Sequence, residues 1–294
     1  MDIIADEEFT EAIVELIRRT STILPQDVVE RLKAYRDKEA PDSRAQRALD
    51  TILNNIQMAE RDSRPICQDT GTVTFDIHYP FGMRQNALAE IIRNGVRRAT
   101  SRHYLRPNVV DPITGAPKVD NTGRGHPAMY FDQWDEDYLK IDLVLKGGGC
   151  ENVGTQYSLP YSPLGAGRDM DGIKKVCLDA VVKAQGKGCA PGVLGIGIGG
   201  DRAQSYLLSK KQLHRKLGDK NQDPGLADLE EWVVENSNKL GIGPMGFGGK
   251  TTLIGAKAAA MDTIPASYFV AVTYMCWAYR RRTMTLKGKE VSYD

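Results

Sequence analysis

The sequence lacks the features of a membrane protein, a secreted protein or a nucleic-acid-binding protein. None of its 294 residues lies in a run approaching the ~18 apolar residues that a membrane-spanning helix needs. The opening segment, MDIIADEEFTEAIVELIRR, is acidic and has neither the basic start nor the apolar centre of a secretory signal. With 39 basic and 38 acidic residues, the formal net charge is only +1, far from the basic excess of a polyanion-binding protein. These absences predict a cytoplasmic protein without a membrane or nucleic-acid partner.

Cysteine is also scarce, odd in number and irregularly spaced. The five cysteines are Cys67, Cys150, Cys177, Cys189 and Cys276, and no two of them stand in the CxxC spacing of many metal sites. A disulfide framework is not expected in a reducing compartment. The thiols are therefore expected to be buried packing groups, reactive groups or metal ligands.

Apolar residues make up 41% of the sequence, and their spacing changes along the chain. Residues 7–60 carry apolar stripes at three- and four-residue spacing, which predict helices. Alternation over residues 73–79 and 139–145 predicts strands, with a helix over residues 83–105 between them. The second half predicts helices over 169–186, 201–217 and 226–241, a buried strand over 192–200, and short strands from Thr251 and Phe269.

These elements predict an α/β (α+β mixed) fold without internal repeats or a clear linker. A single domain over residues 1–294 is the simplest organisation, with a helical N-terminal part over residues 1–60. The expected centre is a mostly antiparallel or mixed sheet flanked by helices.

The local contexts of the thiols differ. Cys177 lies in the apolar stripe of a predicted helix, which favours packing. Cys150 ends the segment KGGGC, where packing and a place near a site both stay open. Cys67, Cys189 and Cys276 lie in loops or at strand ends, where a rigid scaffold displays functional side chains. Three thiolates on a four-iron cluster would leave one iron open to a substrate, an idea that spacing alone does not decide.

Two glycine-rich segments resemble nucleotide-binding motifs incompletely. GPMGFGGKTT has Pro244 where a phosphate-binding loop needs glycine, so a glycine-rich turn before a strand is expected. GIGIGG has the glycine spacing of a dinucleotide fingerprint but lacks the acidic residue expected further on. Its glycines are expected to allow a close backbone approach to the Cys189 loop.

Basic and histidine side chains give weaker signals. The run Tyr279–Arg282 is typical of a solvated face, with anion steering or contact with a partner chain as the alternative. None of the four histidines has a partner at metal-ligand spacing, and His126 is expected to be structural.

Several motifs, taken together and in order, carry a family resemblance. RPICQDTGT, NTGRGHP, KGGGCEN, GCAPGVLGIGIGG, NKLGIGPMGFGGKTT and CWAYRR resemble the α subunit of the class I, iron–sulfur fumarate hydratase and L-tartrate dehydratase family, over roughly residues 10–290. The resemblance implies a hydro-lyase that reversibly hydrates fumarate to L-malate. The alternative within the family is L(+)-tartrate dehydratase, which converts tartrate to oxaloacetate; RPNVVDPITG and KGGGCEN favour fumarate.

The resemblance also implies a site. A [4Fe-4S] cluster would be held by the three thiolates of Cys67, Cys189 and Cys276, while Cys150 stands where relatives have serine. Substrate contacts are implied for Gln68, Asp69, Arg106 and Gly149. Asp69 is the catalytic candidate, for proton transfer or for orienting the hydroxyl, and its alternative role is to cap a turn.

Two departures from the family pattern affect these expectations. Ile264 stands where several relatives have histidine. The chain ends at Asp294, whereas single-chain relatives continue into a further domain, so an α subunit that pairs with a β subunit as α2β2 is expected. A non-catalytic regulatory α-like subunit is the rival from a different class.

Overall fold

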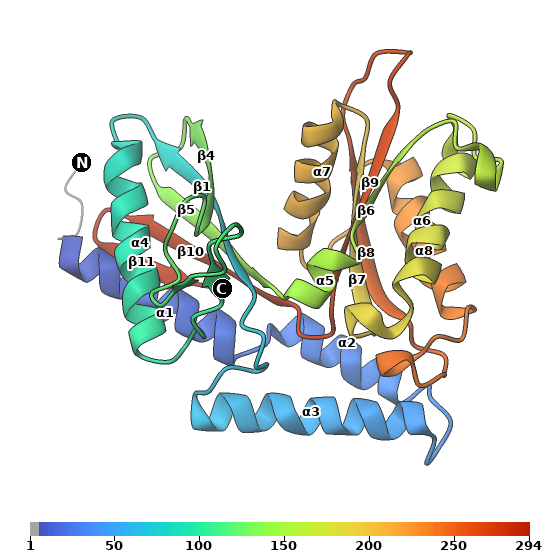
Figure 1. Cartoon of the computed structure of the whole chain (residues 1–294), viewed down its shortest axis with the longest axis horizontal. Coiled ribbons are helices and arrows are strands. Elements are labelled where there is room, and N and C mark those ends of the chain that lie inside the picture. Colours follow the sequence, from blue (N-terminus) through green and yellow to red (C-terminus); the bar gives the residue numbers. More distant parts are fainter. Residues whose placement is uncertain (1–5) are drawn as a thin grey trace. The chain divides into compact units, whose positions relative to one another are not determined.

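The computed structural model describes residues 6–294, which form two compact units (Figure 1). Unit 1 contains the residues up to Pro25, together with Asn55–Gly147 and Arg280–Asp294. Unit 2 contains Gln26–Asn54 and Gly148–Tyr279. Each unit is therefore assembled from segments that are far apart in the sequence.

Unit 1 is built on a five-stranded sheet with the strand order β11-β10-β5-β1-β4. Only β1 and β4 run parallel, and the other neighbours are antiparallel. The strands are β1 (Thr72–Pro80), β4 (Ala128–Trp134), β5 (Leu139–Lys146), β10 (Arg280–Lys287) and β11 (Glu290–Tyr293).

Two helices cover the apolar face of this sheet, α1 (Asp6–Thr22) and α4 (Gln85–Ser101) (Figure 1). Alternate residues of β1, such as Phe75 and Ile77, are fully buried against Ile13 of α1 and Ile92 of α4. Because alternate strand residues point to opposite faces, the other face of the same strands carries polar side chains. A small hairpin of β2 (Val109–Val110) and β3 (Pro117–Lys118) completes the strands of unit 1.

Unit 2 is built on a four-stranded sheet with the order β6-β9-β7-β8. Strands β7 and β8 are parallel, whereas β9 is antiparallel to both β6 and β7. The strands are β6 (Thr155–Ser158), β7 (Gly192–Ile198), β8 (Leu253–Ala260) and β9 (Phe269–Met275). The helices are α2 (Gln26–Arg36), α5 (Gly148–Asn152), α6 (Met170–Ala184), α7 (Arg202–Lys211) and α8 (Pro224–Asn238).

The remaining helical segments connect these elements. Helix α3 (Arg44–Asp62) contributes residues to both units. Short 3₁₀ turns are η1 (Ser162–Leu164), η2 (Gln185–Gly188), η3 (Gln212–His214) and η4 (Pro244–Gly246). Among the residues that the structure describes, no helix is both long and apolar enough to cross a membrane.

The glycines of GIGIGG serve helix packing. A Cβ atom at Gly195 would lie 2.1 Å from the carbonyl oxygen of Ser209, and one at Gly197 would lie 2.2 Å from that of Ser205. Both carbonyls belong to α7, so these glycines let α7 approach β7. The expectation that they face the Cys189 loop was wrong.

The predicted mixed α/β fold with a helical N-terminal region is confirmed. The main difference is that two mixed sheets, one in each unit, replace the expected central sheet. The prediction of a single domain stays a prediction, because compact units need not fold independently. Strand β10 was missed, and Arg280 and Arg281 in it are 1% and 4% exposed. The solvated-face interpretation of that basic run was therefore wrong for these two residues, since β10 lies between β11 and β5.

Candidate functional site

A tight turn before β1 displays Cys67, Gln68 and Asp69 in unit 1. The Gly71 N–H donates a 3.0 Å hydrogen bond to Asp69 Oδ1, so this carboxylate does cap the turn. Gly71 has a φ of +82°, and a Cβ atom there would lie 2.7 Å from the carbonyl carbon of Lys146. Only glycine fits this close contact with the end of β5.

Arg106 joins this turn from the segment that follows α4. Its guanidinium donates a 3.1 Å hydrogen bond to the carbonyl oxygen of Gln68, and its backbone N–H donates to Thr70 Oγ1 at 3.1 Å. Thr70 is buried, whereas Gln68 and Arg106 are exposed. The structure thus brings three predicted substrate residues, Gln68, Asp69 and Arg106, together within unit 1.

A buried arginine supports the same turn, and the sequence analysis missed it. Arg280 donates a 2.9 Å hydrogen bond to the carbonyl oxygen of Asp69. A Cβ atom at Gly147 would lie 2.9 Å from Asp69 Oδ2 and 3.9 Å from an Arg280 nitrogen, so backbone, carboxylate and guanidinium are closely packed. The only sequence signal for this role was the arginine's place in the CWAYRR motif.

Two of the predicted cluster ligands lie on adjoining segments of unit 2. Cys189 follows η2 with a left-handed φ of +56°, and Cys276 follows β9. The N–H of Trp277, next to Cys276, donates a 3.2 Å hydrogen bond to the carbonyl oxygen of Cys189. Cys189 is half-buried and Cys276 is buried.

Helix α5 packs against the loop that carries Cys189. The Cys150 thiol donates to the carbonyl oxygen of Gly188 at 3.8 Å. A Cβ atom at Gly149 would lie 3.3 Å from the carbonyl oxygen of Lys187. The predicted substrate residue Gly149 is therefore a neighbour of the Cys189 loop.

Tyr274 of β9 lies beneath this loop and is 2% exposed. Its ring occupies the space that Cβ atoms would take at Gly188 and Gly192, at 2.5 Å and 2.3 Å from ring atoms. Burial, and then nearby Cys150, Cys276 and Cys189, raise the pKa of the Tyr274 hydroxyl. This buried hydroxyl has no hydrogen-bond partner among residues 6–294. A polar atom without a partner beside several thiols fits a site that holds a thiolate-bound group.

Cys177 is different from these thiols. It is fully buried in α6 within the core of unit 2, and burial raises its pKa to about 12. The thiolate form is therefore suppressed, and the predicted packing role of Cys177 is confirmed.

Unit 1 also contains a group that could hold a metal ion. Ligand atoms of Asp76, His78 and Asp132 all lie within 4.8 Å of one another. The parallel register of β1 and β4 places Asp132 opposite His78. Spacing along the sequence did not indicate this group, because Asp132 comes from another strand.

The phosphate-loop resemblance has a structural explanation. The N–H of Lys250 donates to both carboxylate oxygens of Glu39, at 2.9 Å and 3.0 Å. Gly249 has a φ of +127°, and a Cβ atom there would lie 2.9 Å from Glu39 Oε2. The Lys250 N–H is thus bound by a buried carboxylate of the chain itself, and the predicted glycine-rich turn before a strand is confirmed.

These features define an α/β protein whose loops carry thiols in both units, with polar side chains beside Cys67 in unit 1. Residues 10–285 match the fumarate hydratase (fumerase) family. The chain therefore belongs to the fumarate hydratase family.

Curated relatives divide between two names. The chain is 50% identical over 278 residues to a putative class I fumarate hydratase of Geobacillus stearothermophilus, covering 94% of this chain and 54% of that protein. It is 34% identical over 285 residues to a putative L(+)-tartrate dehydratase subunit alpha of Methanocaldococcus jannaschii, covering 95% of this chain and 98% of that protein. The corresponding Escherichia coli K12 subunit is 32% identical over 284 residues, with 95% and 91% covered. The chain thus spans about half of the first relative and nearly all of the other two.

Proposed function

We propose that this chain is the α-type part of an iron–sulfur hydro-lyase that reversibly hydrates fumarate to L-malate. Support comes from family membership and from the 50% identity to a putative class I fumarate hydratase. The observation that carries the proposal is the meeting of the Cys189 and Cys276 segments around the partnerless hydroxyl of Tyr274.

The proposed cofactor is a [4Fe-4S] cluster held by the thiolates of Cys67, Cys189 and Cys276. Thiolates are the protein ligands of such clusters, and all three side chains occupy loops or strand ends. When bound, the cluster would supply an open iron that acts as a Lewis acid toward substrate oxygen. Gly149 would leave room for the substrate beside the Cys189 loop.

The polar residues of unit 1 would bind and orient the dicarboxylate. Arg106 can hold a carboxylate through its planar fork, and the Gln68 amide can donate a further hydrogen bond. Asp69 would transfer a proton or orient the hydroxyl, because hydration adds a proton to one alkene carbon and hydroxide to the other. The bond from Gly71 to Oδ1 fixes the direction of this carboxylate.

Tartrate is the second candidate substrate, with dehydration to oxaloacetate as the reaction. Two relatives that the chain covers almost completely are named tartrate dehydratase alpha subunits. The word alpha in their names also supports a partner β subunit for this chain. We propose that the two chains form an α2β2 enzyme.

The test is anaerobic purification of the chain co-expressed with its β partner, followed by iron analysis and turnover of fumarate and tartrate. We expect about four irons per chain and fumarate turnover. Cys67→Ser, Cys189→Ser and Cys276→Ser should each lose iron and activity, whereas the control Cys177→Ser should keep both. Equal iron loading in all four variants would refute the ligand set. Tartrate turnover without fumarate turnover would show that tartrate, and not fumarate, is the substrate.

A further inference from the structure

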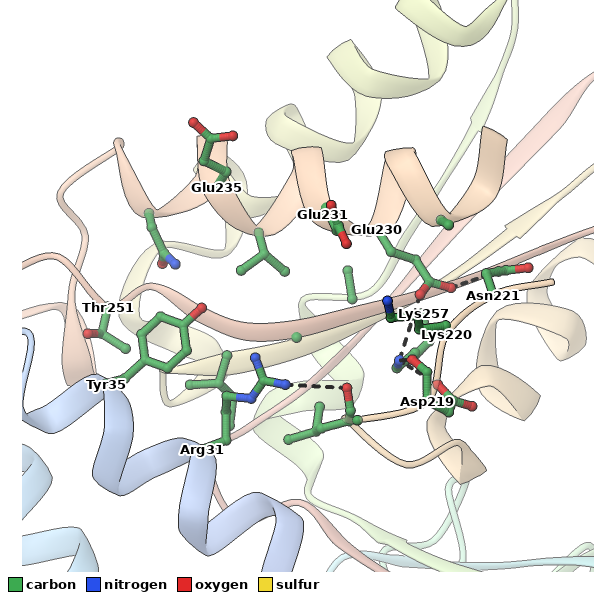
Figure 2. A pocket seen from close by; sticks show the side chains of 18 of the residues that line it. Arg31, Tyr35, Asp219, Lys220, Asn221, Glu230, Glu231, Glu235, Thr251 and Lys257 are labelled. Atoms are coloured by element: carbon green, nitrogen blue, oxygen red, sulfur yellow. Dashed lines mark hydrogen bonds and ion pairs between the residues drawn. The ribbon is translucent and has the colours of Figure 1, made fainter. Parts of the chain in front are cut away.

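A pocket of about 760 Å³ opens within unit 2 between α2 and α8, above strand β8 (Figure 2). This volume falls within the range of about 300–1,000 Å³ that is common for small-molecule sites. None of its lining residues belongs to the proposed cluster or substrate site. The pocket therefore needs an explanation of its own.

Strand β8 is an edge strand, because it pairs only with β7. Helix α8 satisfies its outward peptide groups at two places. Asn238 accepts from the N–H groups of Thr252 and Leu253, at 2.7 Å and 2.9 Å, and donates to the Leu253 carbonyl oxygen at 3.1 Å. Glu230 accepts from the Ala258 N–H at 2.8 Å. Both ends of this strand edge are thus occupied by side chains.

Between these two places lies the peptide group of Ala256. Peptide groups alternate in direction along a strand, so Ala256 turns its N–H and C=O to the same side as Ala258. Ala256 lines the pocket, and the residue of α8 midway between Glu230 and Asn238 is the apolar Val234. A ligand with a hydrogen-bond donor and an acceptor side by side on a flat edge could pair with the N–H and C=O of Ala256.

The pocket is lined by five cationic and four acidic side chains, so an anionic ligand depends on the cations that have no acidic partner in the lining. The buried Lys257 is already neutralised by Asp219 at 2.5 Å and lies 3.7 Å from Glu230. Arg31 of α2 is half-buried, and its guanidinium donates to the Leu217 carbonyl oxygen at 3.5 Å (Figure 2).

Further cations and a polar atom complete the lining. Lys220 and Lys250 add positive charge to the lining and Glu231 adds a negative charge, whereas Glu235 is paired with Lys239 outside the pocket at 2.7 Å. The Thr251 hydroxyl is buried and has no hydrogen-bond partner within residues 6–294. These groups can hold a phosphate, and Tyr35, with the Lys38 ammonium 4.3 Å from its ring centroid, forms part of the wall.

We propose that this pocket binds a nucleotide, with the base edge paired to the Ala256 peptide group and the phosphate paired to Arg31. An extended peptide fits less well, because Glu230 and Asn238 already occupy the neighbouring outward groups of β8. The site is independent of the proposed cluster and needs no iron.

The test is isothermal titration calorimetry on the iron-free chain of 294 residues with AMP and ATP as probes. Adenosine and inorganic phosphate serve as separate arms. We expect saturable nucleotide binding that weakens by about tenfold in both Arg31→Gln and Ala256→Pro. Proline removes the outward N–H and is tolerated on edge strands. Lys287→Gln, which changes an exposed cation of unit 1, is the matched control and should bind as the natural chain does.

Three outcomes would overturn the proposal. One is the lack of saturable binding up to about 10 mM nucleotide, the weak end of specific affinity. Another is unchanged affinity in Arg31→Gln, which remains informative even if Ala256→Pro does not fold. The third is inorganic phosphate binding as tightly as AMP, because the base edge would then contribute nothing.

Discussion

At the scale of single residues, Tyr274 links stability to the proposed cofactor. A buried hydroxyl without a partner costs about 1–3 kcal/mol, and Tyr274 is 2% exposed with no partner among the described residues. A thiolate-bound group beside Cys189 and Cys276 would offer an acceptor. The tyrosine would then be destabilising in the iron-free chain and useful in the loaded one.

The variant Tyr274→Phe separates these two effects. In the iron-free chain we expect the free energy of unfolding to rise by about 1 kcal/mol, measured by urea denaturation. In the anaerobically loaded chain we expect faster iron loss on exposure to air. The control Tyr157→Phe removes a hydroxyl that donates to Asp179 at 2.7 Å, so it should destabilise the iron-free chain. A stability loss in Tyr274→Phe equal to that of the control would contradict this account.

The residues of the candidate site could be predicted only in part. Motif resemblance found Gln68, Asp69 and Arg106, and the structure gathers them. Arg280 was missed because charged residues usually lie at the surface. Its burial follows from the position of β10 inside the sheet, which the sequence pattern did not reveal. The contacts of Tyr274 with Gly188 and Gly192 could not be predicted, because a sequence pattern does not show which side chain packs against a glycine.

At the scale of elements, the contact between β7 and β9 depends on Gly192. A methyl group at this position would lie 2.3 Å from a ring atom of Tyr274, which is far inside van der Waals contact. Neither strand can move away without breaking the ladder that joins them. The glycine is thus required by packing between neighbouring strands.

We expect Gly192→Ala to lower the free energy of unfolding by about 1–3 kcal/mol, the usual effect of overpacking. Gly218→Ala is the matched control, because a methyl group there meets nothing within 4 Å. Urea denaturation of both variants checks the prediction. Equal stability of the two variants would show that the Tyr274 ring moves aside freely.

The free energy of unfolding should depend on pH through Glu15 of helix α1. Hydrogen bonds from Arg18, and then from Arg19, lower the pKa of Glu15 from 4.5 to about 2, against an opposing effect of burial. Because the folded-state pKa is depressed, the stabilisation is complete above pH 4.5 and is lost as the pH falls toward 2.

The measurement is the urea midpoint of the natural chain and of Glu15→Gln as a function of pH. The natural chain should be the more stable above pH 4.5, and the difference should shrink as the pH falls to about 2. A difference that does not change over this range would mean that the ion pairs contribute nothing.

Elements with a clear period were the easiest to predict. The alternation over residues 73–79 and 139–145 identified β1 and β5, and the helix expected over 83–105 is α4. Strand β10 was not predicted, because three consecutive arginines hide the alternation of polar and apolar residues along it. The group of Asp76, His78 and Asp132 could not be predicted for another reason. Its members meet through the register of β1 and β4, which local sequence patterns do not determine.

At the scale of the whole molecule, the two units could not be predicted from local patterns. Unit 1 combines three stretches of sequence and unit 2 combines two, and no change in composition marks the crossings.

We expect the purified chain alone to turn over neither fumarate nor tartrate, and addition of the β partner to restore turnover. The reason is our proposal that residues of the β chain complete the active site. Anaerobic turnover assays with and without the partner check this expectation, with iron content measured in both samples. Full activity of the iron-loaded chain alone would contradict the two-subunit proposal.

The position of β10 also bears on the order in which the chain folds during synthesis. This strand lies inside the sheet of unit 1, between β11 and β5, yet it leaves the ribosome after every segment of unit 2. Residues 148–279 emerge earlier, and with Gln26–Asn54 they already supply every segment of unit 2. Because domains fold as their segments become available, the unit that contains α1 should be the second to reach its native state.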